Sequence, residues 1–462
     1  MKPLTALKLF TLAFGLFLGL CLWKFGNPVI LDHKIPAPTS LAELLNDPWP
    51  THWARWFLLP LVAWGGLLAL AEKFSWPQSR WLWQLPLGWL GWQFVSATQT
   101  VDATLTEATL WQFSGCVACY FVGAFIFSRE NRWRWLLPGV LAAFTFCLIR
   151  GAEQRLYEFP TNYQVLTEGE RGGWTNFPPE TLVSMKADNV IITTNGVDVA
   201  NPVFLKKFAQ GRVAGTMVYP NALAGVILLL WPLALVLALG TTRAMKPLIR
   251  FAVIAMTVFM GGAVLFWTGS KLGWLIAIAL AGLCLLRLDW SKKLKITAIT
   301  LVVLGGLGVF TVRFHNYFAA GATSVGARFD YWHAAVQTTT TKPIFGSGPG
   351  TFQRPYAHLK APESEMARLT HNDYLEQFSD SGVIGGATFV AWIGFALLAA
   401  GKKLWPGKEW VMFAIFIGLL GWFSQSLGEF GLYIPTCWLA FTLLGGLIGG
   451  KRIEFDNKPA NR

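Results

Sequence analysis

Long apolar segments, separated mostly by short polar ones, dominate the sequence. A helix needs about 20 predominantly apolar residues to cross a bilayer, and backbone groups in lipid must be hydrogen-bonded within the segment itself. The segments that approach this length are 5–23, 55–71, 81–97, 109–127, 135–150, 217–240, 251–268, 272–288, 296–312, 382–400, 410–427 and 432–449. The first resembles a signal peptide, but no small-residue cleavage site follows it, so we expect it to remain as a span. The pattern predicts an all-α, polytopic membrane protein with about 12 transmembrane helices.

The distribution of Lys and Arg predicts the orientation of these helices, because basic residues are enriched in short cytoplasmic loops. With the N-terminus inside, the inside segments carry Lys73, Arg80, Arg129, Arg132, Arg134, Arg243, Lys246, Arg250, Arg287, Lys292, Lys293, Lys295, Lys402, Lys403, Lys408, Lys451 and Arg452. The short outside segments 98–108 and 428–431 carry no Lys or Arg. This bias predicts that the chain is a multi-pass protein of a bacterial inner membrane, with its long hydrophilic segments on the periplasmic side.

The predicted topology divides the chain into five parts. They are N-terminal transmembrane helices 1–5 (1–150), a long periplasmic loop (151–216), transmembrane helices 6–9 (217–312), a second long periplasmic loop (313–381), and transmembrane helices 10–12 with a cytoplasmic tail (382–462).

Composition and charge exclude several classes of protein. Of the 462 residues, 54% are hydrophobic and only 14% are charged, which disfavours a soluble domain. The net charge of +13 comes from basic residues at the ends of apolar segments, so we expect membrane lipids and no nucleic acid as partners. All six cysteines lie inside apolar segments, which argues against a disulfide framework. We find no phosphate-binding loop and no metal-ligand spacing, so no cofactor and no metal are expected.

The second long hydrophilic segment carries the candidate chemistry. Apolar residues at helical spacing follow Arg328, a glycine-rich tight loop that exposes backbone amides comes next, and Thr370 to Asp373 resembles the start of a helix. This geometry predicts that His371 lies in the first helical turn, where the positive helix end disfavours imidazolium and attracts anions. A neutral imidazole can accept a proton from a hydroxyl. A surface histidine that merely begins a helix is the alternative.

Motifs in order along the chain resemble the bacterial O-antigen ligase family, which shares a superfamily with the O-antigen polymerases. The signature is His371-Asn372, nine residues, Gly382, two residues and Gly385. The pieces upstream fit in order and spacing: Gly211-Arg212, Gly215-Thr216, Pro220-Asn221, Thr268-Gly269-Ser270-Lys271, Arg328 with Trp332, and Pro343 to Phe352. The resemblance covers about 205–390 of the sequence.

The resemblance implies a multi-spanning, GT-C-like glycosyltransferase. Such an enzyme moves a glycan from an undecaprenyl-diphosphate carrier to a hydroxyl acceptor, here lipid A–core or another glycan or protein, on the periplasmic face. The family reaction is metal-independent and inverting. Carried over, His371 is the base that activates the acceptor hydroxyl, and Arg328 stabilises the diphosphate leaving group. The substrate-binding candidates are Arg212, Lys271, Asn372, Arg354 and Arg368.

Several of these residues have plainer interpretations. Lys271 stands where the family usually has arginine, and a lysine supplies charge without a bidentate fork. Arg212 and Lys271 could anchor helix ends at the membrane interface, while Arg354 and Arg368 could be solvated loop residues. The acids Asp330, Asp373 and Glu376 could orient His371, act as alternative bases or be solvated.

Other functions remain open at this point. A polysaccharide polymerase or a protein O-oligosaccharyltransferase of the same superfamily would use the same chemistry. A solute transporter is the alternative from another class, but transporters commonly place polar groups near the bilayer midplane. Most ionisable residues of this chain lie at span ends or in loops, which argues against transport.

Overall fold

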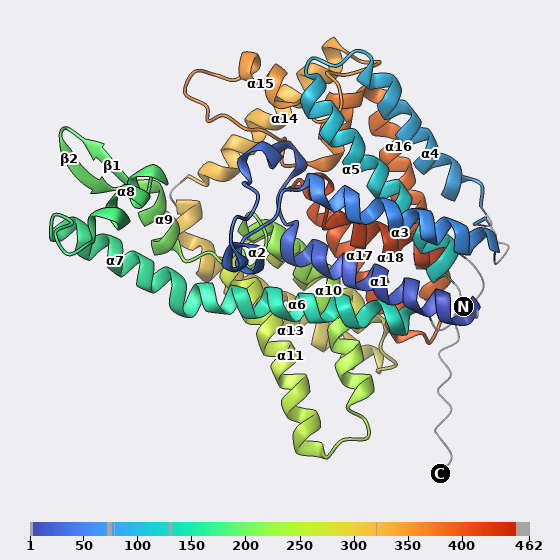
Figure 1. Ribbon diagram of the computed structural model, residues 1–462. Helices are drawn as coiled ribbons and strands as arrows, with labels where there is room; N and C mark the ends of the chain where they lie inside the picture. The colour runs from blue at the N-terminus through green and yellow to red at the C-terminus, as the bar shows by residue number, and fades with distance from the viewer. Residues whose placement is uncertain (1–2, 72–75, 78, 129–131, 320, 450–462) are drawn as a thin grey trace.

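The computed structural model describes residues 3–71, 76–77, 79–128, 132–319 and 321–449, and these residues are mostly helical (Figure 1). Each predicted apolar segment forms a helix. These helices are α1 (Pro3–Lys24), α3 (His52–Ala71), α4 (Trp81–Ala97), α5 (Ala103–Val122), α6 (Trp133–Glu153), α10 (Pro220–Thr241), α11 (Pro247–Thr268), α12 (Lys271–Arg287), α13 (Lys292–Ala319), α16 (Asp373–Leu404), α17 (Trp410–Gln425) and α18 (Cys437–Ile448). The prediction of a helical, polytopic architecture is therefore confirmed.

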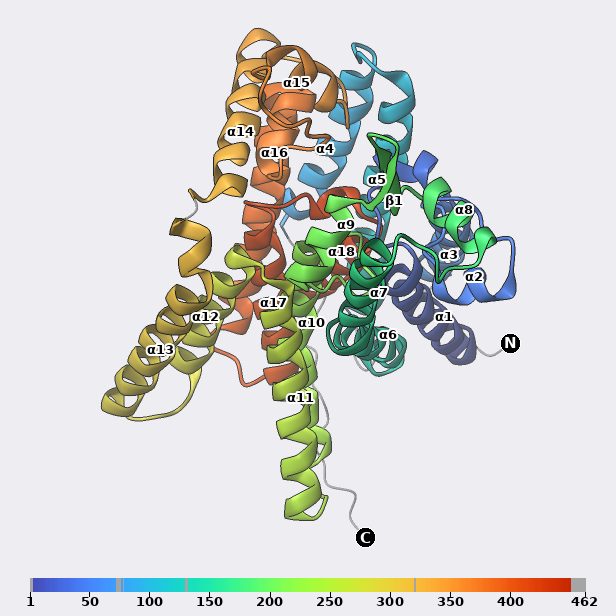
Figure 2. The ribbon, with the colours of Figure 1, turned by 90° about the vertical axis from the view of Figure 1, so that its left-hand side faces the viewer.

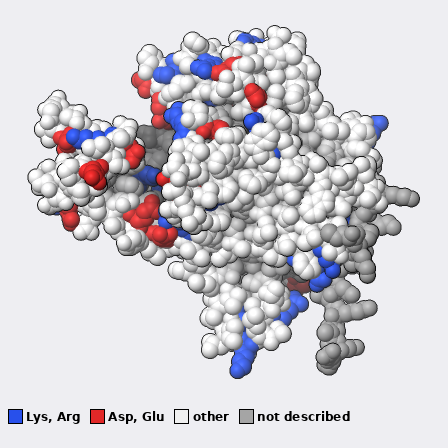
Figure 3. All heavy atoms as spheres, in the orientation of Figure 1, with Lys and Arg blue, Asp and Glu red and all other residues white. Residues whose placement is uncertain are grey.

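The number of membrane spans stays a prediction. By length and composition, 8 helical stretches of the described chain can cross a membrane, and α17 and α18 are shorter apolar helices. The space-filling view has a broad face with few charged atoms, between a charged upper left side and a basic lower tip (Figure 3). Of the basic residues that predicted the orientation, Lys73, Arg129, Lys451 and Arg452 lie outside the described residues, as does the tail 450–462.

The segment 151–216, predicted as a loop, is a small folded lobe at the left of Figure 1. Helix α6 continues through a π-helical turn, η3 (Gln154–Glu158), into α7 (Phe159–Arg171). The lobe adds α8 (Pro179–Ala187), β1 (Ile191–Thr194), β2 (Val197–Ala200) and α9 (Pro202–Gln210). The strands pair antiparallel, with Ile191 opposite Ala200. This hairpin amends the all-α prediction, because β-branched residues flank an Asn195-Gly196 turn whose positive φ angles suit a hairpin.

The segment 313–381 is also largely helical. Helix α13 runs past the predicted span, and α14 (Thr323–Thr341) and α15 (Gln353–Leu359) follow it. The glycine-rich turn after α14 is present, but its amides are not exposed as predicted. The Gly350 amide donates to the Asp380 carboxylate at 2.7 Å, and the Gly348 amide donates to the Asp380 carbonyl at 2.8 Å. The turn therefore packs on α16, and its backbone amides are used within the protein.

Gly382 kinks helix α16 instead of ending it. Its φ of 67° lies in the left-handed region, and a Cβ there would lie 2.1 Å from the Ile344 carbonyl oxygen. Glycine is required because the chain after α14 crosses α16 in direct backbone contact. Figure 2 shows α14 and the upper part of α16 side by side. The kink thus separates the upper part of α16, beside α14, from the longer part of the helix that follows Gly382.

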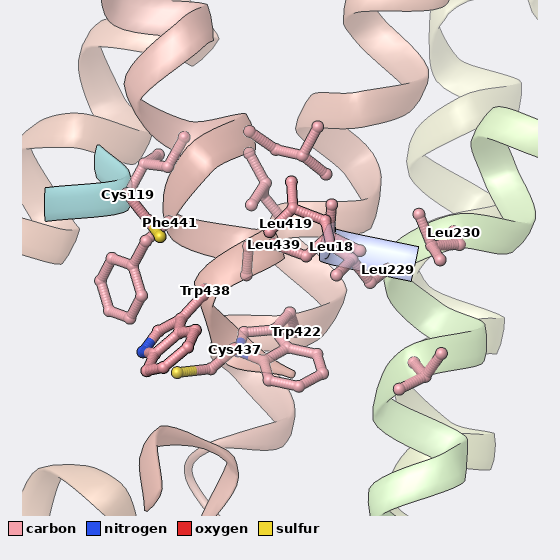
Figure 4. Packing of buried hydrophobic residues seen from close by; sticks show 14 of the residues in the cluster. Leu18, Cys119, Leu229, Leu230, Leu419, Trp422, Cys437, Trp438, Leu439 and Phe441 are labelled. Carbon is pink, nitrogen blue, oxygen red and sulfur yellow. The ribbon is translucent and has the colours of Figure 1, made fainter. Parts of the chain in front are cut away.

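Helices α17 and α18 form the buried centre of the helical body. Leu229 of α10, Leu419 and Trp422 of α17 and Leu439 of α18 belong to one buried cluster (Figure 4). Small residues allow such helices to approach closely. The remaining short elements are η1 (Val29–Lys34), α2 (Leu41–Asn46), η2 (Gly123–Phe127) and η4 (Gly431–Tyr433). The last of these, η4, follows the turn after α17.

Replacing Gly418 with alanine tests this packing. A Cβ at Gly418 would lie 2.0 Å from the Leu229 carbonyl oxygen, so α10 and α17 have to separate. We expect a loss of about 1–3 kcal/mol of stability, measured as a lower thermal unfolding midpoint in detergent. Gly394 of α16 is the matched control, because a Cβ there meets nothing within 4 Å. Equal midpoints for the two variants would contradict the close approach.

Candidate active site

Glu429 is the centre of a cluster of polar side chains at one end of the helical body. It lies in the turn between α17 and η4, and its side chain is only 4% exposed. Oε1 accepts hydrogen bonds from Asn221 at 2.6 Å and from Arg328 at 2.6 Å. Oε2 accepts one from Tyr219 at 2.7 Å and lies 3.2 Å from Nδ1 of His371. The carboxylate therefore joins residues from three other parts of the chain.

His371 lies just before helix α16 and not in its first turn as predicted. Asn372 is the N-cap, and its Oδ1 accepts from the Leu375 amide at 3.0 Å. His371 itself has a φ of 52°, in the left-handed region that non-glycine residues rarely adopt. Glu376 of α16 fixes this turn by accepting from the Thr370 amide and hydroxyl, each at 2.9 Å. Such strained residues cluster at active sites, so this conformation supports a functional role.

The imidazole ring of His371 is held between aromatic side chains. Phe430 lies 4.8 Å away edge-on, and Tyr331 and Tyr219 lie 6.0 and 6.3 Å away, measured between ring centroids. Nδ1 faces Glu429, while no side chain or backbone group in the described chain is hydrogen-bonded to Nε2. A carboxylate next to Nδ1 favours the tautomer that carries its proton there. Nε2 is then the proton-accepting nitrogen.

Two arginines adjoin Glu429. Arg328 of α14 forms the ion pair with Glu429, and its side chain is 21% exposed. Arg212 follows α9, and its Nη2 donates to Asn221 at 2.7 Å while its Nε donates to the Thr268 carbonyl at 2.8 Å. Asn221 therefore links Arg212 to Glu429. The predicted pair Arg212 and Arg328 meets in one site, although 116 positions (328 − 212) separate them in the sequence.

Lys271 extends this positive charge toward the C-terminal end of α13. It follows the N-cap Ser270 in the turn before the predicted span 272–288, and its ammonium group lies 3.6 Å from the ring centroid of Tyr317. Burial lowers the pKa of Lys271 to about 8, with further lowering from Arg212, Arg328 and Arg313. Arg313 of α13 is exposed and stacks over Phe266 at 5.2 Å. Four cations thus share one region with one carboxylate, which makes the region suited to an anionic ligand.

The other predicted substrate-binding residues have different surroundings. Arg354 of α15 is 60% exposed and forms an ion pair with Asp102, with 2.6 Å between Nη2 and Oδ2. Arg368 is half-buried, and within the described ranges no hydrogen bond joins it to Glu429. Asn372 caps α16 and is buried. Their roles in substrate binding stay predictions, and the geometry supports a structural role for Arg354 and Asn372.

The acids near His371 in the sequence do not contact its ring. The Oδ2 atom of Asp373 accepts from the Leu432 amide at 3.1 Å, Glu376 accepts from Thr370, and Asp330 accepts from Ser364 at 3.0 Å. Glu429 holds the position beside Nδ1 instead. Sequence reasoning missed Glu429 because it lies 58 positions after His371 (429 − 371), in a segment noted only for lacking Lys and Arg. An acid isolated in a short turn between two apolar helices is the signal that could have found it.

The fold and this cluster define a multi-pass membrane protein with a His–Glu–Arg site at one end of its helices. Residues 255–390 match the family model described as O-Antigen ligase. This segment is therefore similar to the O-antigen ligase family, and the resemblance found in the sequence is confirmed for it. The matched segment contains Lys271, Arg313, Arg328 and His371, whereas Arg212 and Glu429 lie outside it. The family match supports a membrane glycosyltransferase of the O-antigen ligase or polymerase type.

A curated relative gives a second comparison. An uncharacterized protein of Haemophilus influenzae is 30% identical to this chain over 142 residues. The match covers 26% of this chain and 35% of the relative. The chain thus matches about a third of the relative's length.

Proposed function

We propose that this protein is an O-antigen ligase-like glycosyltransferase. It moves a glycan from an undecaprenyl-diphosphate carrier to a hydroxyl of lipid A–core on the periplasmic face of the inner membrane. The observation that carries the proposal is the contact between His371 and Glu429 beside the cations Arg212, Lys271, Arg313 and Arg328. This arrangement supports a proton acceptor beside a binding site for a diphosphate.

The proposed reaction begins with the acceptor hydroxyl at Nε2 of His371. As the hydroxyl oxygen attacks the anomeric carbon, its proton moves to Nε2, and Glu429 stabilises the imidazolium through Nδ1–H. The bond between the anomeric carbon and the diphosphate oxygen breaks, so the electron pair leaves with the diphosphate. Attack opposite to the leaving group inverts the anomeric centre.

The cations supply the second part of the proposed catalysis. Negative charge grows on the diphosphate as the bond breaks, and preorganised positive groups stabilise it best in a site with little water. Arg328 uses Nη2 for Glu429, which leaves its other guanidinium N–H groups to the ligand. Lys271 and Arg313 form no ion pair within the described residues, so their charge is available to the diphosphate.

Complementation of a ligase-deficient strain tests the proposed function. The strain supplies a compatible lipid-linked glycan, and the readout is the ladder of lipopolysaccharide bands at equal protein expression. We expect wild type to restore the ladder and His371→Ala to fail. If wild type also fails, while the same protein extends or transfers the glycan in a polymerase or protein-glycosylation assay, lipid A–core is not the acceptor.

Arg328→Lys tests the leaving-group role. Lysine keeps the charge but loses the planar fork that holds Glu429 and a phosphate oxygen together. We expect kcat/KM for the lipid-linked donor to fall by about tenfold or more, measured in proteoliposomes. Arg171→Lys is the matched control, and we expect a change of about twofold or less, because Arg171 of α7 is exposed and lies outside the candidate site. Wild-type kinetics in Arg328→Lys would remove Arg328 from the leaving-group site.

The pH dependence of donor use tests Lys271. Because its pKa is lowered to about 8, the ammonium charge is present below pH 8 and is lost as the pH rises through that value. Since kcat/KM reports groups of the free enzyme, kcat/KM for the donor is expected to fall between about pH 7.5 and 9. Lys271→Arg should flatten this limb, because arginine stays protonated. An identical alkaline limb in the variant would assign it to another group.

A further inference from the structure

An apolar cavity lies between α10, α12 and α17, outside the candidate site. Its volume is about 580 Å³, and its walls are almost wholly apolar, with Trp231 and Leu235 from α10, Ala281 from α12 and Phe413 from α17. We call this cavity the α10–α12 groove. Figure 2 shows that α11 and the α12–α13 pair diverge below the helical body. Its size and apolar lining fit a hydrocarbon chain.

The groove runs away from His371. On α12 its first lining residue is Ala277, six positions after Lys271, which is about 9 Å along the helix axis. Its last is Leu288, just past the other end of α12. On α10 it extends from Leu228 to Arg243 beyond the helix end. The groove is therefore a separate site, and its far end coincides with the basic ends of the helices.

Two arginines mark that far end. Arg243 lines the groove and is exposed. The guanidinium of Arg287 lies 4.7 and 3.8 Å from the ring centroids of Trp410 and Phe413, which are both lining residues. Its Nη2 donates to the Leu404 carbonyl at 3.1 Å, while its buried Nη1 has no hydrogen-bond partner. No ion pair neutralises either arginine within the described chain.

The surrounding charge is also positive. The adjoining helix ends carry Lys246, Arg250, Lys292, Lys293 and Lys295, against the acids Asp289 and Glu409. Glu409 interacts with Arg287 electrostatically, but the two side chains form no ion pair in the described chain. The lower tip of the molecule is correspondingly basic in Figure 3. Basic pockets between transmembrane helices bind anionic lipid headgroups.

We propose that the α10–α12 groove binds an anionic glycerophospholipid. An acyl chain fills the apolar part, and the phosphate lies against Arg243 and Nη1 of Arg287. The isoprenoid tail of a lipid-linked donor fits less well, because its diphosphate belongs at the opposite end, near Lys271, and leaves both arginines without a counter-charge. A zwitterionic lipid supplies no net charge for them.

Native mass spectrometry of the purified full-length protein with phosphatidylglycerol tests the proposal. We expect wild type to retain one phosphatidylglycerol in preference to phosphatidylethanolamine. Arg243→Gln should weaken this binding by about fivefold, since a basic side chain near lipid phosphate contributes on that scale. Ala281→Phe should weaken it by filling the groove. Arg134→Gln is the matched control, because Arg134 of α6 is an exposed arginine outside the lining and should bind as wild type.

Three results would overturn the proposal. They are equal retention of phosphatidylethanolamine, wild-type affinity in Arg243→Gln, and displacement of phosphatidylglycerol by undecaprenyl phosphate, which would assign the groove to the isoprenoid. The thermal unfolding midpoint of each variant without added lipid shows whether it folds. Because the readout is lipid binding, the result does not depend on glycan transfer.

Discussion

Replacing His371 with alanine is expected to lower the rate of glycan transfer by about 10²–10⁴-fold, the usual contribution of a general base. The variant loses the nitrogen that takes the acceptor proton, while the cations that hold the donor remain. The drop should therefore appear in kcat, with KM for the lipid-linked donor nearly unchanged. The measurement is the initial rate in proteoliposomes that contain purified protein, donor and acceptor. Substantial remaining transfer would remove His371 as the base.

Two further variants separate this role from folding. His371→Asn keeps a residue type that tolerates the left-handed backbone at φ 52°, so the turn before α16 is preserved, and it should be as inactive as His371→Ala. His358→Ala changes an exposed histidine on α15 and should transfer at the wild-type rate. If the asparagine variant is active while the alanine variant is not, the backbone turn and not the imidazole is what transfer needs.

Glu429→Gln is expected to lower kcat on the order of 10²–10⁴-fold, comparable with the loss of the orienting carboxylate in a catalytic triad. A glutamine can accept hydrogen bonds from Asn221, Arg328 or Tyr219 through its oxygen. It then presents its amide N–H groups to Nδ1 of His371. Nδ1 becomes an acceptor, so the proton moves to Nε2 and blocks the site where the acceptor hydroxyl binds.

The matched control is Glu365→Gln. Glu365 also accepts a hydrogen bond near the site, from Tyr331 at 2.5 Å, but it is exposed and does not contact His371. We expect little change in kcat for this variant. A wild-type kcat in Glu429→Gln, at an unchanged thermal unfolding midpoint, would show that Glu429 only holds the structure together.

Much of the helical architecture could be predicted because lipid imposes a simple requirement on the chain. A long apolar segment satisfies its backbone only as a helix, and every such segment here is one. The fold of the lobe at 151–216 was not predicted, because its apolar segments are short. Its small core consists of Leu166, Trp174, Ile191 and Ala200. The glycine-rich turn was recognised, but its partner Asp380 was not, because nothing local pairs residues 30 positions apart (380 − 350).

The residues of the candidate site that belong to the matched motifs could be predicted, but Glu429, which connects them, could not. His371, Arg328, Lys271 and Arg212 followed from a resemblance that fixes order and spacing, and they do lie around one region. The first-turn position of His371 was wrong, because Asn372 is the better cap and takes that place. Glu429 was missed because the role of a buried carboxylate depends on the groups that donate hydrogen bonds to it. Here those donors are distant in the sequence.

The position of Glu429 late in the chain sets the order in which the site is assembled during synthesis. Arg212, Lys271, Arg328 and His371 are synthesised first. Glu429, whose carboxylate connects them, is synthesised 58 residues after His371 (429 − 371). A nascent protein whose last two apolar helices have not yet entered the membrane therefore has the cations without their organising anion. If Glu429 has its proposed role, glycan transfer requires the C-terminal helices to be in place, and incompletely inserted copies are expected to be inactive.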